Sequence, residues 1–206
     1  MTEPVVQAIR DEAALRQIYP EPVDLIKRKV LARLDSHALQ FLELASLAFV
    51  STAAPDGTCD VSPRGDQAGF MRVLSLSRIA FPDWPGNNRI DSLRNIIAHP
   101  GIGLVMVVPG HHDCLRINGR AFVTVDPDLL RNMQVERRMP RSAVVVDITE
   151  VYFHCGRAFR RSDAWNPARY PAPGVLPTLA RIIADQTRPD AGEKTMLDRS
   201  DNDPLY

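Results

Sequence analysis

The sequence predicts a mainly β protein with flanking helices, in which six antiparallel strands form a closed or nearly closed barrel. Short apolar runs bounded by Gly, Pro or Asp turn residues follow one another through the middle of the chain. Only one short helical segment interrupts them, so the regular alternation of strand and helix typical of a parallel sheet is absent. With 206 residues, 45% of them hydrophobic, the chain can bury one full core.

The first 45 residues are predicted to be helical. Apolar residues recur at helical spacing from Val23 to Ala45. The pattern breaks at Asp35 and Ser36, where Ser36 is expected to cap a second helix. Two successive helices should therefore precede the barrel.

The predicted strands begin directly after these helices. Residues 47–52 form the first, and a turn at Pro55-Asp56-Gly57 leads into a partner strand at 59–62, which makes a hairpin. The motif at 62–66 is expected to be the turn that follows. Four more strands are predicted at 73–81, 103–108, 115–125 and 143–152.

A helix of about three turns is predicted between Arg89 and Pro100. Its apolar residues share one face: Ile90, Leu93, Ile96 and Ile97. Asn88 is expected to cap the first turn, with Asp91 as its capping-box partner. Free N–H groups, a partial positive charge and the guanidinium of Arg89 would together hold a phosphate here. The alternative is an ordinary capped surface helix with a solvated Arg89.

The last part of the chain is predicted to be extended. Four prolines between residues 167 and 177 precede a short helix at 179–185 and a polar tail expected to be disordered. The chain then divides into an N-terminal helical segment (1–45), the barrel (46–167) and a C-terminal extension (168–206), in a single domain overall.

Charge and composition argue against several classes of partner. Lys plus Arg and Asp plus Glu both total 25, so no global field attracts nucleic acid or an anionic membrane. There is no run of about 18 apolar residues, and no basic region followed by an apolar run begins the sequence. Three widely spaced cysteines suit a reducing compartment, so a cytoplasmic protein is expected.

Several separated motifs, in order, resemble those of the pyridoxamine 5'-phosphate oxidase-like flavoproteins. They are Ser62-Pro63-Arg64-Gly65-Asp66, Ile79-Ala80-Phe81-Pro82-Asp83, Pro85-Gly86-Asn87-Asn88-Arg89 and Ser92-Leu93-Arg94-Asn95-Ile96. Further motifs from residue 115 to 167 resemble an uncharacterised branch of that family described as FMN-dependent enzymes. The resemblance implies the FMN-binding split barrel, with FMN near the subunit interface of a homodimer.

The resemblance also implies cofactor contacts. Five residues would line the flavin ring and ribityl chain: Ser62, Pro63, Arg64, Gly65 and Asp66. Phe81 and Pro82 would lie on the neighbouring strand, and Cys114 falls near a family glutamine that contacts the flavin. Asn88 and Arg89 occupy the places of a serine and an arginine that grip the phosphate.

The sequence departs from the family pattern in two places. Ile90 stands where the oxidases carry a second phosphate-binding cation, so Arg64 is expected to supply that charge. Arg64 or Arg116 would also stabilise the reduced anionic flavin near its pyrimidine edge. The C-terminal segment lacks the family's pattern for pyridoxamine phosphate, which leaves the substrate open.

Weaker candidates lie towards the end of the barrel. His154 is either a proton donor over the substrate or a half-buried structural histidine, and Arg161 and Trp165 are substrate-side candidates. Residues 111–114 include four possible metal ligands, but neighbouring strand residues point to opposite faces, so no metal site is predicted.

Three functions remain open at this level. The first is an FMN-dependent oxidoreductase that acts on a small molecule. The second is a flavin-binding protein without turnover, and the third is a split-barrel protein that uses another ligand, such as a deazaflavin or haem. The fold alone does not separate them.

Overall fold

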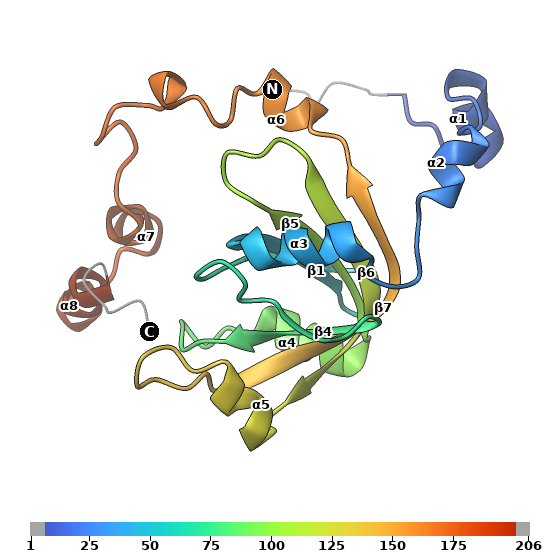
Figure 1. Ribbon diagram of the computed structural model, residues 1–206. Helices are drawn as coiled ribbons and strands as arrows, with labels where there is room; N and C mark the ends of the chain where they lie inside the picture. Colours follow the sequence, from blue (N-terminus) through green and yellow to red (C-terminus); the bar gives the residue numbers. More distant parts are fainter. Residues whose placement is uncertain (1–6, 201–206) are drawn as a thin grey trace.

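A computed structural model describes residues 7–200, which form a curved, fully antiparallel sheet flanked by helices (Figure 1). Its strand order is β2-β1-β5-β6-β7-β4-β3. The strands are β1 (Leu47–Ala53), β2 (Cys59–Gly65), β3 (Arg72–Ser75), β4 (Arg78–Asp83), β5 (Gly101–Val107), β6 (Cys114–Thr124) and β7 (Ser142–His154). The mainly β prediction is confirmed.

The sheet has seven strands where six were predicted. The predicted strand at 73–81 is a hairpin, because the chain turns between β3 and β4. The Ser75 hydroxyl accepts a hydrogen bond from the backbone N–H of Ser77 at 3.2 Å, which gives the chain a local alternative to the ladder.

The expected turn at 62–66 is wrong. Residues up to Gly65 continue β2, an edge strand that pairs only with β1. Pro63, opposite Phe49, is tolerated there because an edge strand has one side that needs no ladder donor. The motif therefore presents side chains from an extended strand.

The core fills the inside of the barrel. Its largest fully buried side chains include Phe81, Ile79, Leu104, Met106 and Ile117. One end of the barrel is covered by α3 (Ser36–Leu44), which buries Ala38, Phe41 and Leu42 against the strands. The helix is capped by Asp35 rather than Ser36, since the Asp35 carboxylate accepts from the N–H of Ala38 at 2.8 Å.

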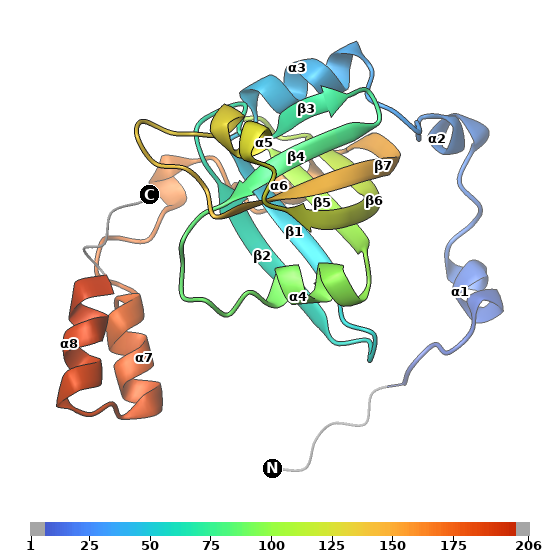
Figure 2. The same cartoon turned by 90° about the horizontal axis from the view of Figure 1, so that it is seen from below.

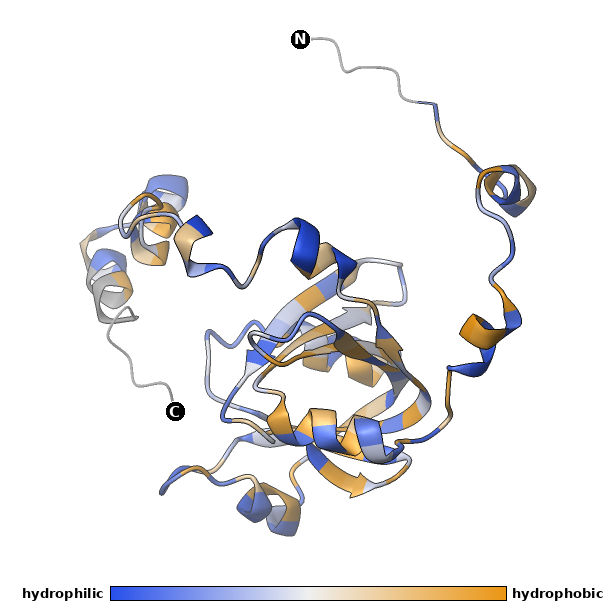
Figure 3. Ribbon diagram, turned by 45° about the horizontal axis from the view of Figure 1, so that its top comes forward, coloured by the Kyte–Doolittle hydropathy of each residue, from blue (hydrophilic) through white to orange (hydrophobic). Residues whose placement is uncertain are grey.

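Two short helices, α1 (Glu12–Ile18) and α2 (Asp24–Arg28), precede α3, so the N-terminal segment holds three helices rather than two. Neither buries a residue, and both lie away from the barrel in Figures 1 and 2. The apolar residues of α2 are visible in orange in Figure 3. The chain first joins the sheet where Leu31 pairs with Val151.

The helix predicted between Arg89 and Pro100 is present but shorter, as α4 (Asp91–Ala98). Neither α5 (Pro127–Asn132) nor α6 (Arg157–Arg161) was predicted. A 3-10 turn at Pro167–Arg169 leads to α7 (Leu179–Thr187) and α8 (Ala191–Ser200), which lie side by side away from the barrel (Figures 1 and 2). The tail expected to be disordered is thus helical through residue 200.

Residues 1–6 and 201–206, the ends of the predicted N-terminal segment and C-terminal extension, lie outside the described residues. Between them, from residue 7 to residue 200, no helix has the length and apolar character needed to cross a bilayer.

Candidate functional site

The barrel is split between β2 and β4, which are not neighbours in the sheet and are joined by side chains instead. The guanidinium of Arg64 lies 2.7 Å from the carboxylate of Asp83, and both side chains are largely buried, at 22% and 15% exposed. One residue beyond each strand, the indole N–H of Trp84 donates to Asp66 at 2.9 Å. We call these two side-chain contacts the seam. One cavity is lined by β2 residues up to Arg64, and a second is lined by the chain from Asp66 onward.

The larger cavity, which we call the α4 cavity, has a volume of about 420 Å³. Its walls are residues 60–64 of β2, the loop from Asp83 to Ile90, the first turn of α4, and Arg141 with Ser142 at the start of β7. The volume falls in the range of about 300–1,000 Å³ typical of small-molecule sites.

Side-chain hydrogen bonds fix α4 against the sheet. Ser92, only 5% exposed, donates its hydroxyl to the carboxylate of Asp60 on β2. Asn95 donates to the hydroxyl of Thr52 on β1 at 3.1 Å. Because both contacts are made from one face of a two-turn helix, the start of α4 is held at the edge of the cavity.

The predicted cap of α4 is wrong. The N-cap residue is Ile90, in the left-handed region at φ 52°, and no side chain caps the helix. Asn88 is also left-handed, at φ 60°, and its side-chain oxygen accepts from Arg141 at 3.1 Å. Asp91 is the first helical residue and pairs with Arg89 at 2.9 Å. The first N–H groups of α4 therefore have no side-chain acceptor.

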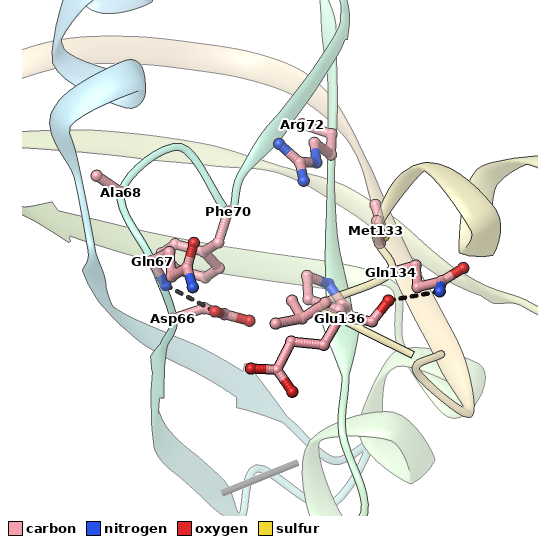
Figure 4. A pocket seen from close by; sticks show the side chains of 10 residues that line it. Asp66, Gln67, Ala68, Phe70, Arg72, Met133, Gln134 and Glu136 are labelled. Atoms are coloured by element: carbon pink, nitrogen blue, oxygen red, sulfur yellow. Dashed lines mark hydrogen bonds between the residues drawn. The ribbon is translucent and has the colours of Figure 1, made fainter. Parts of the chain in front are cut away.

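The smaller cavity, which we call the Asp66 cavity, has a volume of about 280 Å³ and is shown in Figure 4. Phe70 and Met133, both buried, contribute to its apolar surface. Asp66 enters from the end of β2 and Glu136 from the loop after α5, while Arg72 lines another side. The Asp66 carboxylate also accepts from the N–H of Gln67 at 2.6 Å.

Most of the predicted cofactor contacts between Ser62 and Arg89 line one of the two cavities. Five of these residues line the α4 cavity: Ser62, Pro63, Arg64, Asn88 and Arg89. Asp66 and Pro82 line the Asp66 cavity. Gly65 and Phe81 line neither cavity. The side chain of Phe81 points into the core and is 1% exposed.

The remaining predicted residues lie on other parts of the chain. Cys114 is buried beside His154 on the paired strands, and burial raises the pKa of its thiol. Arg116 lies over the ring of Tyr152, 5.3 Å from its centroid. None of these residues lines either of the two cavities.

Trp165 and Arg161 also lie apart from both cavities. The Trp165 indole stacks on Phe159 and donates to the carbonyl of His111 at 2.9 Å. Arg161 ends α6, the helix that carries Phe159. Within one chain, these substrate-side candidates are not brought to the cofactor-side residues.

Among the residues of the α4 cavity that sequence reasoning missed are Asp60, Trp84, Ser92 and Arg141. Ser92 gave no signal beyond its place in a helix, and Asp60 none beyond its place in a strand. Arg141 lies 53 residues from Asn88 along the chain, and only the pairing of β4 with β7 brings them together.

A curved antiparallel sheet with a side-chain seam and a ligand-sized cavity beside it defines a split β-barrel. The family model described as "Pyridoxamine 5'-phosphate oxidase" matches residues 34–155. The chain therefore belongs to the pyridoxamine 5'-phosphate oxidase family, as the motifs between residues 62 and 96 indicated.

The solved structures that match this chain share little sequence with it. A variant of HupZ from Group A Streptococcus is 14% identical, with a TM-score of 0.48 over 58% of this chain and 98% of its own. A protein from Lactobacillus delbrueckii, named as a candidate pyridoxamine 5'-phosphate oxidase, is 23% identical, with a TM-score of 0.46 over 59% and 95%. General Stress Protein 26 from Bacillus anthracis is 10% identical, with a TM-score of 0.44 over 56% and 88%. No curated protein matches the chain.

Proposed function

We propose that this protein binds FMN in the α4 cavity and acts as an FMN-dependent oxidoreductase on a small molecule. One observation carries the proposal: the uncapped first turn of α4 opens on a cavity of about 420 Å³ that is also lined by arginines. Backbone N–H groups at a helix start, together with guanidinium groups, form a site suited to a phosphate.

An unsatisfied donor at the same place supports the fit. The Nε atom of Arg64 is buried and has no hydrogen-bond partner, although the Nη1 atom of the same side chain pairs with Asp83. A buried donor without an acceptor is costly unless a ligand or water satisfies it. Because Arg64 lines the α4 cavity, an oxygen-rich ligand there would supply the acceptor.

In this proposal the chain's residues bind and orient the cofactor. Asn88 and Arg89 would hold the phosphate, and the residues of β2 from Ser62 to Asp66 would lie along the ribityl chain and ring. Arg64 would place a positive charge beside the flavin, which favours its reduced anionic form. FMN, when bound, supplies the two-electron redox chemistry.

The proposal includes a homodimer in the cytoplasm. Large apolar side chains between residues 9 and 31 are exposed in the single chain: Ile9, Leu15, Ile18, Tyr19, Val23, Leu25, Ile26, Val30 and Leu31. A second subunit would cover such residues, and would also be needed to bring Cys114, Arg116, His154, Arg161 and Trp165 to a cofactor. Light scattering of the purified protein tests the dimer.

The proposed cytoplasmic location rests on the cysteines. The three cysteines are free, which suits a reducing compartment.

The test of FMN binding is spectroscopic. Purified protein, or protein mixed with FMN, should show a flavin absorption band that stays with the protein on gel filtration. Bleaching of this band by a reduced nicotinamide cofactor without oxygen, as hydride is transferred to the flavin, supports an enzyme. Binding without flavin reduction supports a flavin-binding protein. A protein that takes up no FMN contradicts the proposal and turns attention to deazaflavin or haem.

A further inference from the structure

We infer that Arg141 is the principal cation for the phosphate of a ligand bound in the α4 cavity. The inference rests on the proposed function and goes beyond it, because neither the motifs nor the family pattern points to this residue. It replaces Arg64 as the second phosphate cation expected from the sequence.

The charges around the cavity single out Arg141. Three arginines line it, and two are already paired with carboxylates: Arg64 with Asp83 at 2.7 Å and Arg89 with Asp91 at 2.9 Å. Among the side chains that the structure describes, no carboxylate forms an ion pair with the Arg141 guanidinium within 4.0 Å. Its side-chain hydrogen bond is to the neutral amide oxygen of Asn88.

The acidic residues of the cavity strengthen this argument. Asp91 belongs to the first turn of α4, and Asp60 of β2 accepts a hydrogen bond from the Ser92 hydroxyl of the same turn. Their negative charges oppose an anion and offset the partial positive charge of the helix start. A phosphate that carries nearly two negative charges therefore needs a cation whose charge is not already neutralised, and Arg141 is that cation.

The backbone holds Arg141 in place. Its N–H donates to the carbonyl of Asp83, the last residue of β4, at 3.1 Å. The following residue, Ser142, begins β7 and pairs with the same Asp83. On its other side, the guanidinium is oriented by Asn88, whose left-handed backbone belongs to the loop before α4.

The guanidinium retains donors for a ligand. Arginine has five N–H donors, and Asn88 accepts from one nitrogen, Nη1. The remaining donors suit the paired oxygens of a phosphate. Arg141 thereby supplies, from the end of the loop before β7, the charge that is lost where Ile90 replaces a basic residue of the family pattern.

The experiment compares FMN with riboflavin, which lacks the phosphate. Arg141→Gln removes the charge and keeps an amide that can donate to Asn88, while Arg141→Lys keeps the charge. Arg138→Ala is the matched control, since Arg138 is an exposed arginine of the same loop that lines neither cavity. The dissociation constant for each flavin is measured by flavin fluorescence, and thermal unfolding checks that each variant is folded.

We expect Arg141→Gln to weaken FMN binding by about 10- to 100-fold and to leave riboflavin binding unchanged. Arg141→Lys should retain part of the FMN affinity, and Arg138→Ala all of it. Equal FMN binding by the wild type and Arg141→Gln overturns the inference. So does an equal loss for FMN and riboflavin, which indicates a structural role.

A wild type that binds neither flavin contradicts the proposed function rather than the role of Arg141. Inorganic phosphate, titrated by the fluorescence of Trp84 in the α4 cavity, then tests Arg141 directly. A Trp165→Phe background leaves Trp84 as the single tryptophan. Phosphate binding that is lost in Arg141→Gln supports the inference, and no binding, or equal binding by both proteins, overturns it.

Discussion

The guanidinium of Arg64 and the carboxylate of Asp83 lie 2.7 Å apart and link β2 to β4, two strands that share no backbone ladder. The same pair also lines the α4 cavity. One contact therefore closes the barrel and shapes the site, so its loss should affect both.

Replacing Arg64 with Ala should lower the free energy of unfolding by about 1–3 kcal/mol, because the largely buried Asp83 carboxylate loses its partner. Urea unfolding measures the change. Arg78→Ala is the control, since Arg78 pairs with Asp147 at a similar 2.6 Å but both side chains are 46% exposed. Its effect should be much smaller because solvent screens the pair. Equal losses in the two variants would contradict a special role for the seam.

Gly119 should not tolerate a side chain. It lies on β6 opposite a bulge of β7, where a Cβ atom would overlap the backbone carbonyl oxygen of Asp147 on β7. Since backbone in the middle of a sheet has little room to move, Gly119→Ala should destabilise the protein by about 1–3 kcal/mol. Gly103→Ala in β5 is the control, because its Cβ would meet only the side-chain oxygen of Asn118, at 3.5 Å. Thermal unfolding compares them, and similar midpoints would count against the bulge as a constraint.

The three cysteines should differ in reactivity. Burial raises the pKa of Cys114, which keeps its thiol neutral, whereas Cys59 and Cys155 are exposed. The thiolate is the reactive form, so a disulfide reagent at pH 8 should modify two thiols quickly and the third only after unfolding. In Cys114→Ala the slow thiol should disappear. Three fast thiols in the folded wild type would show that Cys114 is accessible.

The same shift has a consequence for stability. The folded state favours the protonated thiol of Cys114. Below the ordinary pKa range of a thiol, the group is protonated in both the folded and unfolded states, so it gives the free energy of unfolding no pH dependence. As the pH rises through that range, the unfolded chain loses its proton first and the free energy of unfolding falls. Cys114→Ala should lack this part of the alkaline decrease.

The N-terminal helices should be dispensable for the barrel. Since α1 and α2 bury no residue, a chain that begins at Lys29 should keep the unfolding midpoint of the full chain at low protein concentration. By contrast, Leu42→Ala in α3 should cost about 2–5 kcal/mol, because Leu42 is 1% exposed in the core. A large loss on removing residues 1–28 would contradict this division of the chain.

The sequence identified the barrel because alternating apolar residues and turn residues act locally. The sequence-based prediction was wrong where pairing between distant strands determines the conformation. The composition of residues 62–66 is typical of a turn, yet pairing with β1 keeps the motif extended as far as Gly65. The direction of Phe81 could not be read from the sequence, since four successive residues of β4 are buried and no alternation marks a face.

In the candidate site, too, residues close together in the sequence were predicted and residues brought together by strand pairing were not. Arg89 and Asn88 were found beside α4 because they adjoin its first turn in the chain. The hydrogen bond between Arg141 and Asn88 depends on the pairing of β4 with β7, and no local pattern reveals it. The cap of α4 was mispredicted because propensity favours Asn at a helix start, whereas here the loop directs the Asn88 side chain to Arg141.

The left-handed backbone of Ile90 has a consequence for the proposed phosphate site at the start of α4. This conformation costs an ordinary L-residue about 1–2 kcal/mol, and a branched Cβ makes it rarer still. The folded protein already holds Ile90 in this conformation without a ligand, because hydrogen bonds from Ser92 and Asn95 fix α4 against β2 and β1. In the proposed phosphate site, the backbone donors at the start of α4 would therefore be in position before the ligand binds.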